Sequence, residues 1–134
     1  MRAIVFPGQG AQTIGMGKAL ADAYPGAKAV FDEVDDALGE SLSGLIWEGE
    51  ADELTLTANA QPALMATSLA AVRALEEEGI SVTEAAYVAG HSLGEYSALA
   101  AAGALSVGDT ARLLRTRGKA MQEAVPVGVG AMAA

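Results

Sequence analysis

The sequence predicts an α/β domain with a small parallel sheet. Two short apolar runs, residues 3–6 and 85–89, have the length and composition of buried strands, and each leads into a glycine-containing turn. Segments of helical length separate them, and strands divided by helices are typical of a parallel sheet. Because a parallel sheet with covered faces seldom has so few strands, we expect this chain to be part of a larger domain.

The chain opens with the strand at residues 3–6, which Pro7-Gly8 ends, and a glycine-rich loop follows to Gly17. The remaining predicted elements are the strand at 85–89 and helical segments at residues 16–38 (broken near Pro25), 62–78, 95–102 and 106–125. Residues 41–57 are mixed, with short helical stretches around 45–47 and 52–54. The second helical segment is predicted to begin at Pro62, because a proline in the first turn loses no hydrogen bond. Ser106 is a suitable N-cap for the last one.

The composition restricts the classes of function. The 134 residues include 8 Lys and Arg and 17 Asp and Glu, a formal net charge of −9, which argues against nucleic-acid binding and against adhesion to an anionic membrane. With no cysteine and one histidine, the chain cannot form disulfides, a thiolate metal site or a two-histidine zinc site. No apolar run approaches the roughly 18 residues of a membrane span, and no signal-peptide pattern is present. We therefore expect a soluble, cytoplasmic protein without a metal.

The strongest chemical signal is Gly90-His91-Ser92-Leu93-Gly94, a G-x-S-x-G pattern between a predicted strand and a predicted helix. In this context a sharp turn lifts the serine oxygen clear of the sheet, and Gly90 and Gly94 avoid clashes in that turn. The N–H of Leu93, at the start of the helix, favours a developing oxyanion. We predict that Ser92 is a nucleophile; the alternative is an ordinary turn of small residues.

His91 is poorly placed to serve as the base for Ser92, because consecutive side chains diverge in a tight turn. We predict a supporting role for it in the packing of the turn. A serine nucleophile needs a base, which comes from a distant segment. Since His91 is the only histidine, the chain is expected to lack a base of its own.

The loop Gly8-Gln9-Gly10 follows the first strand but matches no phosphate-binding pattern. Thr13 stands where a dinucleotide fingerprint needs its third glycine, and Gly17-Lys18 is followed by Ala19, which excludes a Walker loop. In hydrolase-like sheets, an early loop commonly supplies the second N–H of the oxyanion hole. Gln9 is the candidate for that role.

The last predicted helix carries cations on two faces. Arg112, Arg115, Lys119 and Gln122 share a face that we expect to be solvated, whereas Arg117 falls among apolar residues on the opposite face. A guanidinium in such a place needs an anion. The residues alone leave two interpretations open: a structural ion pair with Asp or Glu, and a clamp for the carboxylate of a substrate.

Four motifs occur in an order that is similar to a known family. They are PGQGAQ at residues 7–12, QPAL at 61–64, GHSLGEYS at 90–97 and RGKAM at 117–121. Together they closely resemble the malonyl-CoA:acyl carrier protein transacylases of fatty-acid synthesis and the related acyltransferase domains of polyketide synthases. The resemblance covers essentially the whole chain, but only the N-terminal part of the family's protein.

The resemblance implies a hydrolase-like α/β core with a parallel sheet and a nucleophile elbow, incomplete in this chain. Residues 1–127 would form the N-terminal part of the large domain. Residues 128–134 would form the opening strand of a ferredoxin-like small domain. The resemblance also implies that a malonyl group passes from coenzyme A to the thiol of the acyl carrier protein through a malonyl-serine at Ser92, with no cofactor besides the thioester substrate.

Under this resemblance, the N–H groups of Gln9 and Leu93 form the oxyanion hole, and Arg117 holds the free carboxylate of malonate. The family's catalytic histidine lies downstream of the elbow, so we expect this chain alone to be inactive or very slow. The family's carrier protein is acidic. We therefore predict that it docks on a basic surface of this chain that comprises Arg112, Arg115 and Lys119. The complete enzyme is expected to be a monomer.

Three alternatives remain open at this stage. One is a serine hydrolase, in which water replaces the carrier thiol and a carboxylate clamp has no purpose. Another is a non-catalytic binding or scaffold protein, which the missing histidine suggests. The third is an acyltransferase domain of a polyketide synthase, although Met1 directly before the first strand favours a stand-alone enzyme. Exposed sheet edges predict poor solubility for the chain alone.

Overall fold

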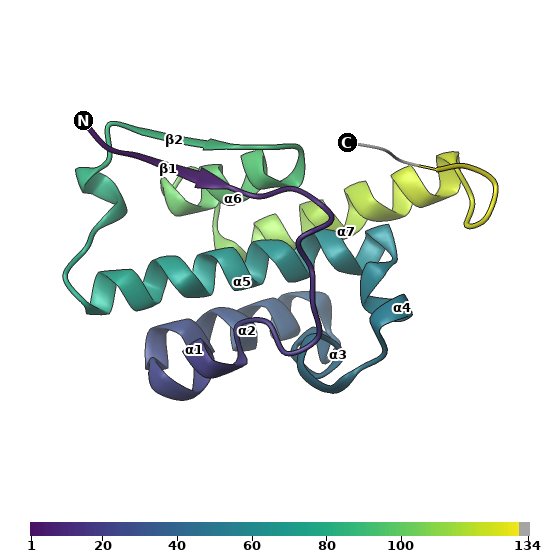
Figure 1. Cartoon of the computed structure of the whole chain (residues 1–134), viewed down its shortest axis with the longest axis horizontal. Coiled ribbons are helices and arrows are strands. Elements are labelled where there is room, and N and C mark those ends of the chain that lie inside the picture. Colours follow the sequence, from purple (N-terminus) through teal and green to yellow (C-terminus); the bar gives the residue numbers. More distant parts are fainter. Residues whose placement is uncertain (132–134) are drawn as a thin grey trace.

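The computed structural model describes residues 1–131, which are mostly helical around a small sheet. The elements in chain order are β1 (Ala3–Phe6), α1 (Lys18–Ala23), α2 (Pro25–Leu38), α3 (Leu42–Glu48), α4 (Ala51–Thr55), α5 (Thr57–Glu77), a 3-10 helix (Val82–Glu84), β2 (Tyr87–Gly90), α6 (Leu93–Ala101) and α7 (Val107–Ala124). Figure 1 shows the sheet along one side, α6 against it, α5 and α7 across the middle, and α1–α3 beyond them. No helix of this part of the chain is long and apolar enough to cross a membrane.

The two strands pair in parallel, which confirms the predicted strand type. Their register runs from Ala3 opposite Tyr87 to Phe6 opposite Gly90. Because parallel strands end at the same edge of a sheet, the loop after β1 and the turn after β2 leave the sheet side by side (Figure 1). The sheet thereby brings the Gln9 loop next to the Ser92 turn.

The prediction that both strands are buried is wrong for one face of the sheet. Phe6 is 5% exposed, but Val5 is 74% and Tyr87 is 64% exposed. Alternate strand residues point to opposite faces, and α6 packs against both strands on one of them. Within the described residues, the other face is uncovered.

α5 occupies the centre of the core and contacts α2, α6 and α7. Its Leu69 is fully buried. Below it, Phe31 of α2 meets Trp47 of α3 edge to face, with ring centroids 4.9 Å apart. The N-cap prediction for α7 is confirmed, since the hydroxyl of Ser106 accepts a hydrogen bond from the N–H of Asp109. The helical break before Pro25 is confirmed as well.

α5 begins at Thr57, so the predicted start at Pro62 is wrong. Pro62 lies inside the helix, where it has no N–H to donate to the carbonyl of Ala58 four residues earlier. Arg115 of α7 supplies the missing donor: its Nη1 lies 2.6 Å from the Ala58 oxygen. A tertiary contact from α7 therefore satisfies the carbonyl that Pro62 leaves without a helical partner.

The face of α7 predicted to be solvated is in part its packed face. The Arg115 side chain is 14% exposed and pairs with Glu40, and burial lowers its pKa from the ordinary value. A Cβ on Gly118 would lie 2.7 Å from the Cα of Ala58, so α7 rests directly on the first turn of α5. Helical periodicity shows which residues share a face, but it does not say which face another helix covers.

The residues after α7 form a turn in which Gly128 has a φ of 83°. Residues 132–134 lie outside the described part of the chain. The predicted domain boundary at residue 128 and the predicted strand that follows it therefore stay predictions.

Candidate active site

Ser92 stands in the turn between β2 and α6 with a φ of 54° and a ψ of −113°. It is the only residue other than glycine with a positive φ among those described. This conformation is strained for a residue with a Cβ and persists only where the surrounding structure holds it. Leu93, the first residue of α6, is fully buried, whereas Ser92 itself is exposed. The strained turn thus presents the serine hydroxyl to solvent.

The two flanking glycines leave no room for a side chain. A Cβ on Gly90 would overlap the backbone of Gly94, and a Cβ on Gly94 would lie 2.8 Å from the carbonyl oxygen of Pro7. Strand β1, the turn and the start of α6 therefore approach one another through bare backbone. This agrees with the reason for which the sequence pattern requires glycine at both positions.

His91 joins the turn to the loop after β1. Its N–H donates to the carbonyl of Phe6 at 3.2 Å, and a Cβ on Gly8 would lie 2.6 Å from its Nδ1. Within residues 1–131 the imidazole makes no hydrogen bond to the hydroxyl of Ser92. The contacts support a packing role for His91, which stays a prediction.

Arg117 reaches the serine from α7. Its Nη2 lies 3.0 Å from Ser92 Oγ, its Nη1 donates to Oε1 of Gln61 at 2.7 Å, and its guanidinium stands 5.6 Å from the ring centroid of Tyr96. In the described part of the chain, no Asp or Glu oxygen lies within 4 Å of this guanidinium. Within residues 1–131, Arg117 therefore forms no structural ion pair with an Asp or a Glu, and that interpretation is wrong for the described part of the chain.

Gln61, which the sequence singles out only by its place in a motif, is the second partner of Arg117. Gln61 is 1% exposed, and its Nε2 donates to the sulfur of Met121 at 3.3 Å. Its amide is one of few polar groups buried in the described structure. A polar residue directly before Pro62 and the apolar run at residues 62–66 is the sequence signal that could have drawn attention to it.

The predicted oxyanion donors Gln9 and Leu93 lie in the two segments that the sheet brings together. Neither backbone N–H donates a hydrogen bond within the described residues. The Gln9 side chain is held by Thr57, because its Nε2 donates to Oγ1 at 3.1 Å. The assignment of these two N–H groups to an oxyanion hole stays a prediction.

A pocket of about 640 Å³ adjoins the site and has Gln9 and Met121 among its lining residues. Its other walls are the segment from α4 to the start of α5 and the chain after α7. Leu56 and Val125 contribute to a lining that is mainly apolar. The pocket could accept an uncharged chain beside the site.

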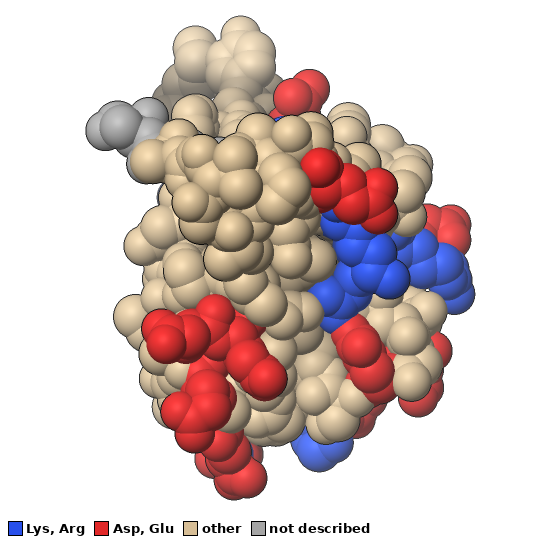
Figure 2. Space-filling view, turned by 90° about the vertical axis from the view of Figure 1, so that its right-hand side faces the viewer, with Lys and Arg blue, Asp and Glu red and all other residues tan. Residues whose placement is uncertain are grey.

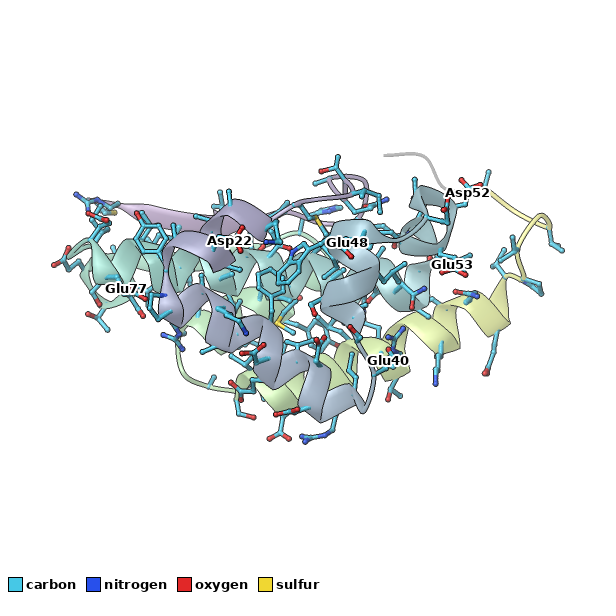
Figure 3. The ribbon with its side chains drawn as sticks, turned by 90° about the horizontal axis from the view of Figure 1, so that it is seen from below. Asp22, Glu40, Glu48, Asp52, Glu53 and Glu77 are labelled. Carbon is cyan, nitrogen blue, oxygen red and sulfur yellow. The ribbon has the colours of Figure 1, made fainter. Side chains whose placement is uncertain are left out.

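The predicted docking surface is smaller than expected. Arg115 donates a hydrogen bond to the carbonyl of Ala58 and forms an ion pair with Glu40. Arg112 forms an ion pair with Asp109 at 2.7 Å. Figure 2 shows Lys and Arg side chains in a small cluster bordered by Asp and Glu. Figure 3 shows the labelled carboxylates along several helices, with Glu40 directed toward α7. Arg115 is therefore a structural residue and not a docking residue.

Comparison with known proteins gives several matches that span nearly the whole chain. The family model for the acyl transferase domain matches residues 3–134. The chain is 58% identical over 132 residues to the malonyl CoA-acyl carrier protein transacylase of Bacillus subtilis, a match of 98% of this chain and 41% of that protein. The crystal structure of an acyl-carrier-protein S-malonyltransferase from Bartonella henselae has a TM-score of 0.91 and 63% identity, over 96% of this chain and 41% of that one.

A third match is a complex of a type II polyketide-synthase acyl carrier protein with its malonyl-transacylase. It has a TM-score of 0.86 and 48% identity, and the match covers 92% of this chain and 40% of that one. The chain thus spans about two fifths of the length of these relatives.

These matches confirm the resemblance that the four motifs indicated. Three of the motifs supply the residues that hydrogen bonds join beside the turn, because Arg117 contacts both Gln61 and Ser92. Because the family model covers residues 3–134, the chain belongs to the family of acyl transferase domains.

Proposed function

We propose that the chain is part of a malonyl-CoA:acyl carrier protein transacylase of fatty-acid synthesis. The observation that carries the proposal is the contact between Arg117 and the hydroxyl of Ser92. A malonyl thioester has its free carboxylate two bonds from the carbonyl carbon that a nucleophile attacks. A guanidinium within 3.0 Å of the attacking oxygen is therefore placed to bind that carboxylate while the carbonyl reacts.

In the proposed reaction, Ser92 Oγ attacks the thioester carbonyl, and the N–H groups of Gln9 and Leu93 stabilise the oxyanion. The carbon–sulfur bond then breaks, the malonyl group remains on the serine, and coenzyme A leaves with the proton that the serine gave up. The thiol of the carrier protein then attacks the carbonyl of the malonyl-serine. The bond to Ser92 Oγ breaks, the malonyl group passes to the thiol sulfur, and the thiol proton returns to the serine. The strained turn supports this assignment because it exposes Oγ at the end of the sheet.

The serine proton requires a base, and His91 does not contact Ser92 Oγ in the described structure. We propose that the base is a histidine in the part of the full-length protein that this chain does not span. Positioned acid–base groups typically contribute about 10²- to 10⁴-fold to a rate. The chain by itself is then a slow acyl acceptor with a formed binding site.

The same proposal includes the acyl carrier protein as the partner, in keeping with the complex formed by one of the relatives. A serine hydrolase is disfavoured, because a simple esterase has no use for a cation beside the nucleophile. A polyketide-synthase acyltransferase domain is the second candidate. The Bacillus subtilis relative reported above is named a malonyl CoA-acyl carrier protein transacylase, which favours the first proposal over this one.

The test is to incubate the chain with malonyl-CoA, and separately with acetyl-CoA, and to follow the intact mass with time. We expect a malonyl adduct that Ser92→Ala abolishes. Arg117→Ala should slow the malonyl adduct by about 10- to 100-fold, the usual worth of a hydrogen bond to a charged group, and affect the acetyl adduct less.

Arg112→Ala is the matched control, because Arg112 is an exposed arginine of the same helix. An equal loss in this variant would contradict a specific clamp at Arg117. A malonyl adduct that survives Ser92→Ala would contradict the nucleophile, and no adduct on the unaltered chain would contradict a formed site within these residues.

A further inference from the structure

We propose that Gln61 is a positioning residue for selectivity: it holds Arg117 through a neutral acceptor, so that the positive charge of the guanidinium remains available to the carboxylate of the acyl group. This inference rests on the proposed function, because it assigns a partner to the carboxylate clamp. Three observations carry it: the buried amide of Gln61, the charge balance around Arg117, and the contacts that lock α5 to α7.

The amide of Gln61 has one possible orientation. Arg117 has donors and no acceptor, so the atom facing its Nη1 at 2.7 Å must be the amide oxygen. The amide nitrogen then faces the sulfur of Met121, a weak acceptor. A flipped amide would set two donors against each other in a place where the residue is 1% exposed. Gln61 therefore presents a fixed oxygen to Arg117.

The charge of Arg117 is not neutralised by the described residues. Its two hydrogen-bond partners, Gln61 and Ser92, are both uncharged, and the Tyr96 ring is neutral. Glu40, which Figure 3 shows directed toward α7, forms its ion pair with Arg115 and not with Arg117. A carboxylate in place of the Gln61 amide would form an ion pair with Arg117 and compete with the carboxylate of a substrate. Glutamine at this position orients the cation and leaves its charge for the ligand.

The distance between Gln61 and Arg117 is held by the contact between their helices. Arg115 donates to Ala58 O at 2.6 Å, and Gly118 allows α7 to approach the Ala58 backbone. These contacts lie on either side of Arg117 along α7 and one turn before Gln61 along α5. The backbones that carry the two side chains thus cannot separate without loss of buried hydrogen bonds, which gives the Gln61–Arg117 contact a defined geometry.

The substitution Gln61→Glu separates positioning from simple packing. It keeps the size of the side chain and an acceptor for Arg117, and it adds a negative charge. If Gln61 only fills space and satisfies Arg117, this variant should be at least as stable as the original chain, with unchanged selectivity. If Gln61 preserves the charge of the clamp, the variant should lose its preference for acyl groups that carry a carboxylate.

The first measurement is the rate of adduct formation on the full 134-residue chain with malonyl-CoA and with acetyl-CoA. We expect Gln61→Glu to lower the malonyl-to-acetyl rate ratio by about 10- to 100-fold. Thr116→Glu is the charge-matched control, because Thr116 is exposed on α7 next to Arg117. An unchanged ratio in Gln61→Glu, or an equal fall in Thr116→Glu, would overturn the proposal.

The second measurement does not depend on acyl transfer. With ¹⁵N-labelled arginine, the Nε–H signal of Arg117, assigned through Arg117→Lys, is followed during titration with sodium malonate. We expect the dissociation constant of malonate to rise at least about tenfold in Gln61→Glu, and the signal to show faster side-chain motion in Gln61→Met. Malonate binding of equal strength in Gln61→Glu would overturn the inference. Intact binding without any adduct would contradict the proposed acyl transfer and leave the role of Gln61 supported.

Discussion

At the scale of single residues, Ser92 combines its proposed chemical role with a strained backbone. A residue other than glycine in such a conformation costs of the order of 1–3 kcal/mol. Burial of Leu93 and the close approach of Gly94 to β1 hold the turn in place. The strain and the exposure of the hydroxyl are therefore two results of the same packing.

Ser92→Gly should raise the stability of the chain while it removes the malonyl adduct. Glycine adopts a φ of 54° without the Cβ clash, so we expect the free energy of unfolding to rise by about 1 kcal/mol. Urea denaturation followed by circular dichroism measures the change. Ser92→Ala keeps the Cβ and should not be stabilised; equal stabilisation in both variants would argue against backbone strain.

Gly94→Ala should destabilise the turn strongly. Its Cβ would lie 2.8 Å from the carbonyl oxygen of Pro7, backbone that cannot move without separating β1 from α6. We expect a loss of at least about 2 kcal/mol in the free energy of unfolding. Gly108→Ala, where the nearest atom would be 3.5 Å away, is the control and should be neutral or slightly stabilising. Equal effects at the two positions would contradict the close approach.

At the scale of the elements, α5 and α7 are joined through a carbonyl that a proline leaves without a helical donor. Pro62 has no N–H for Ala58, and the Arg115 guanidinium takes its place. Arg115 also donates to Asn59 Oδ1 and pairs with Glu40. One largely buried arginine thus connects α7 with α5 and with the residues after α2.

Arg115→Met should cost about 2 kcal/mol or more, because it leaves the Ala58 carbonyl and Glu40 without their partner. Pro62→Ala restores an N–H to the helix. The loss caused by Arg115→Met should then be about 1 kcal/mol smaller in the Pro62→Ala background. A double-mutant cycle by urea denaturation measures this coupling, with Arg112→Met as the surface control. Strict additivity would show that the Arg115 contact does not replace the missing donor.

At the scale of the whole molecule, the described residues form a helical body with a two-stranded sheet whose outer face is open. Val5 and Tyr87 are large apolar residues on that face. Exposed apolar strand faces and unpaired strand edges are typical sites of association. The predicted poor solubility of the chain has a structural basis there.

We expect the chain to bind the dye ANS and to associate as its concentration rises. The double substitution Val5→Thr and Tyr87→Thr keeps β-forming residues and removes most of the apolar side-chain area, so both signals should fall. Light scattering and dye fluorescence measure them. Leu113→Thr, at an exposed position on α7, is the control; a fall of the same size in that variant would mean that the open sheet face is not the cause.

Much of the local structure could be predicted from neighbours in the chain. The strand ended by Pro7-Gly8 and the Ser106 cap depend on contacts within a few residues, and the glycines that the Ser92 turn requires lie within two residues of the serine. The four motifs identified the family for the same reason, since each is a short run whose chemistry is carried by its own side chains and backbone. These features were determined by the sequence itself.

Other features were decided only by contacts between distant segments. In the first turn of α5, the Ala58 carbonyl receives its hydrogen bond from Arg115, which lies 57 residues later in the chain. Arg117 likewise donates to Gln61, which lies 56 residues earlier. Periodicity grouped Arg115 with solvated residues, although the helix that covers α7 lies on that side. Burial and pairing at such separations arise when helices pack, and no local propensity specifies which faces meet. The sequence determined the turn and the serine that stands in it, and the tertiary structure decided which residues surround them.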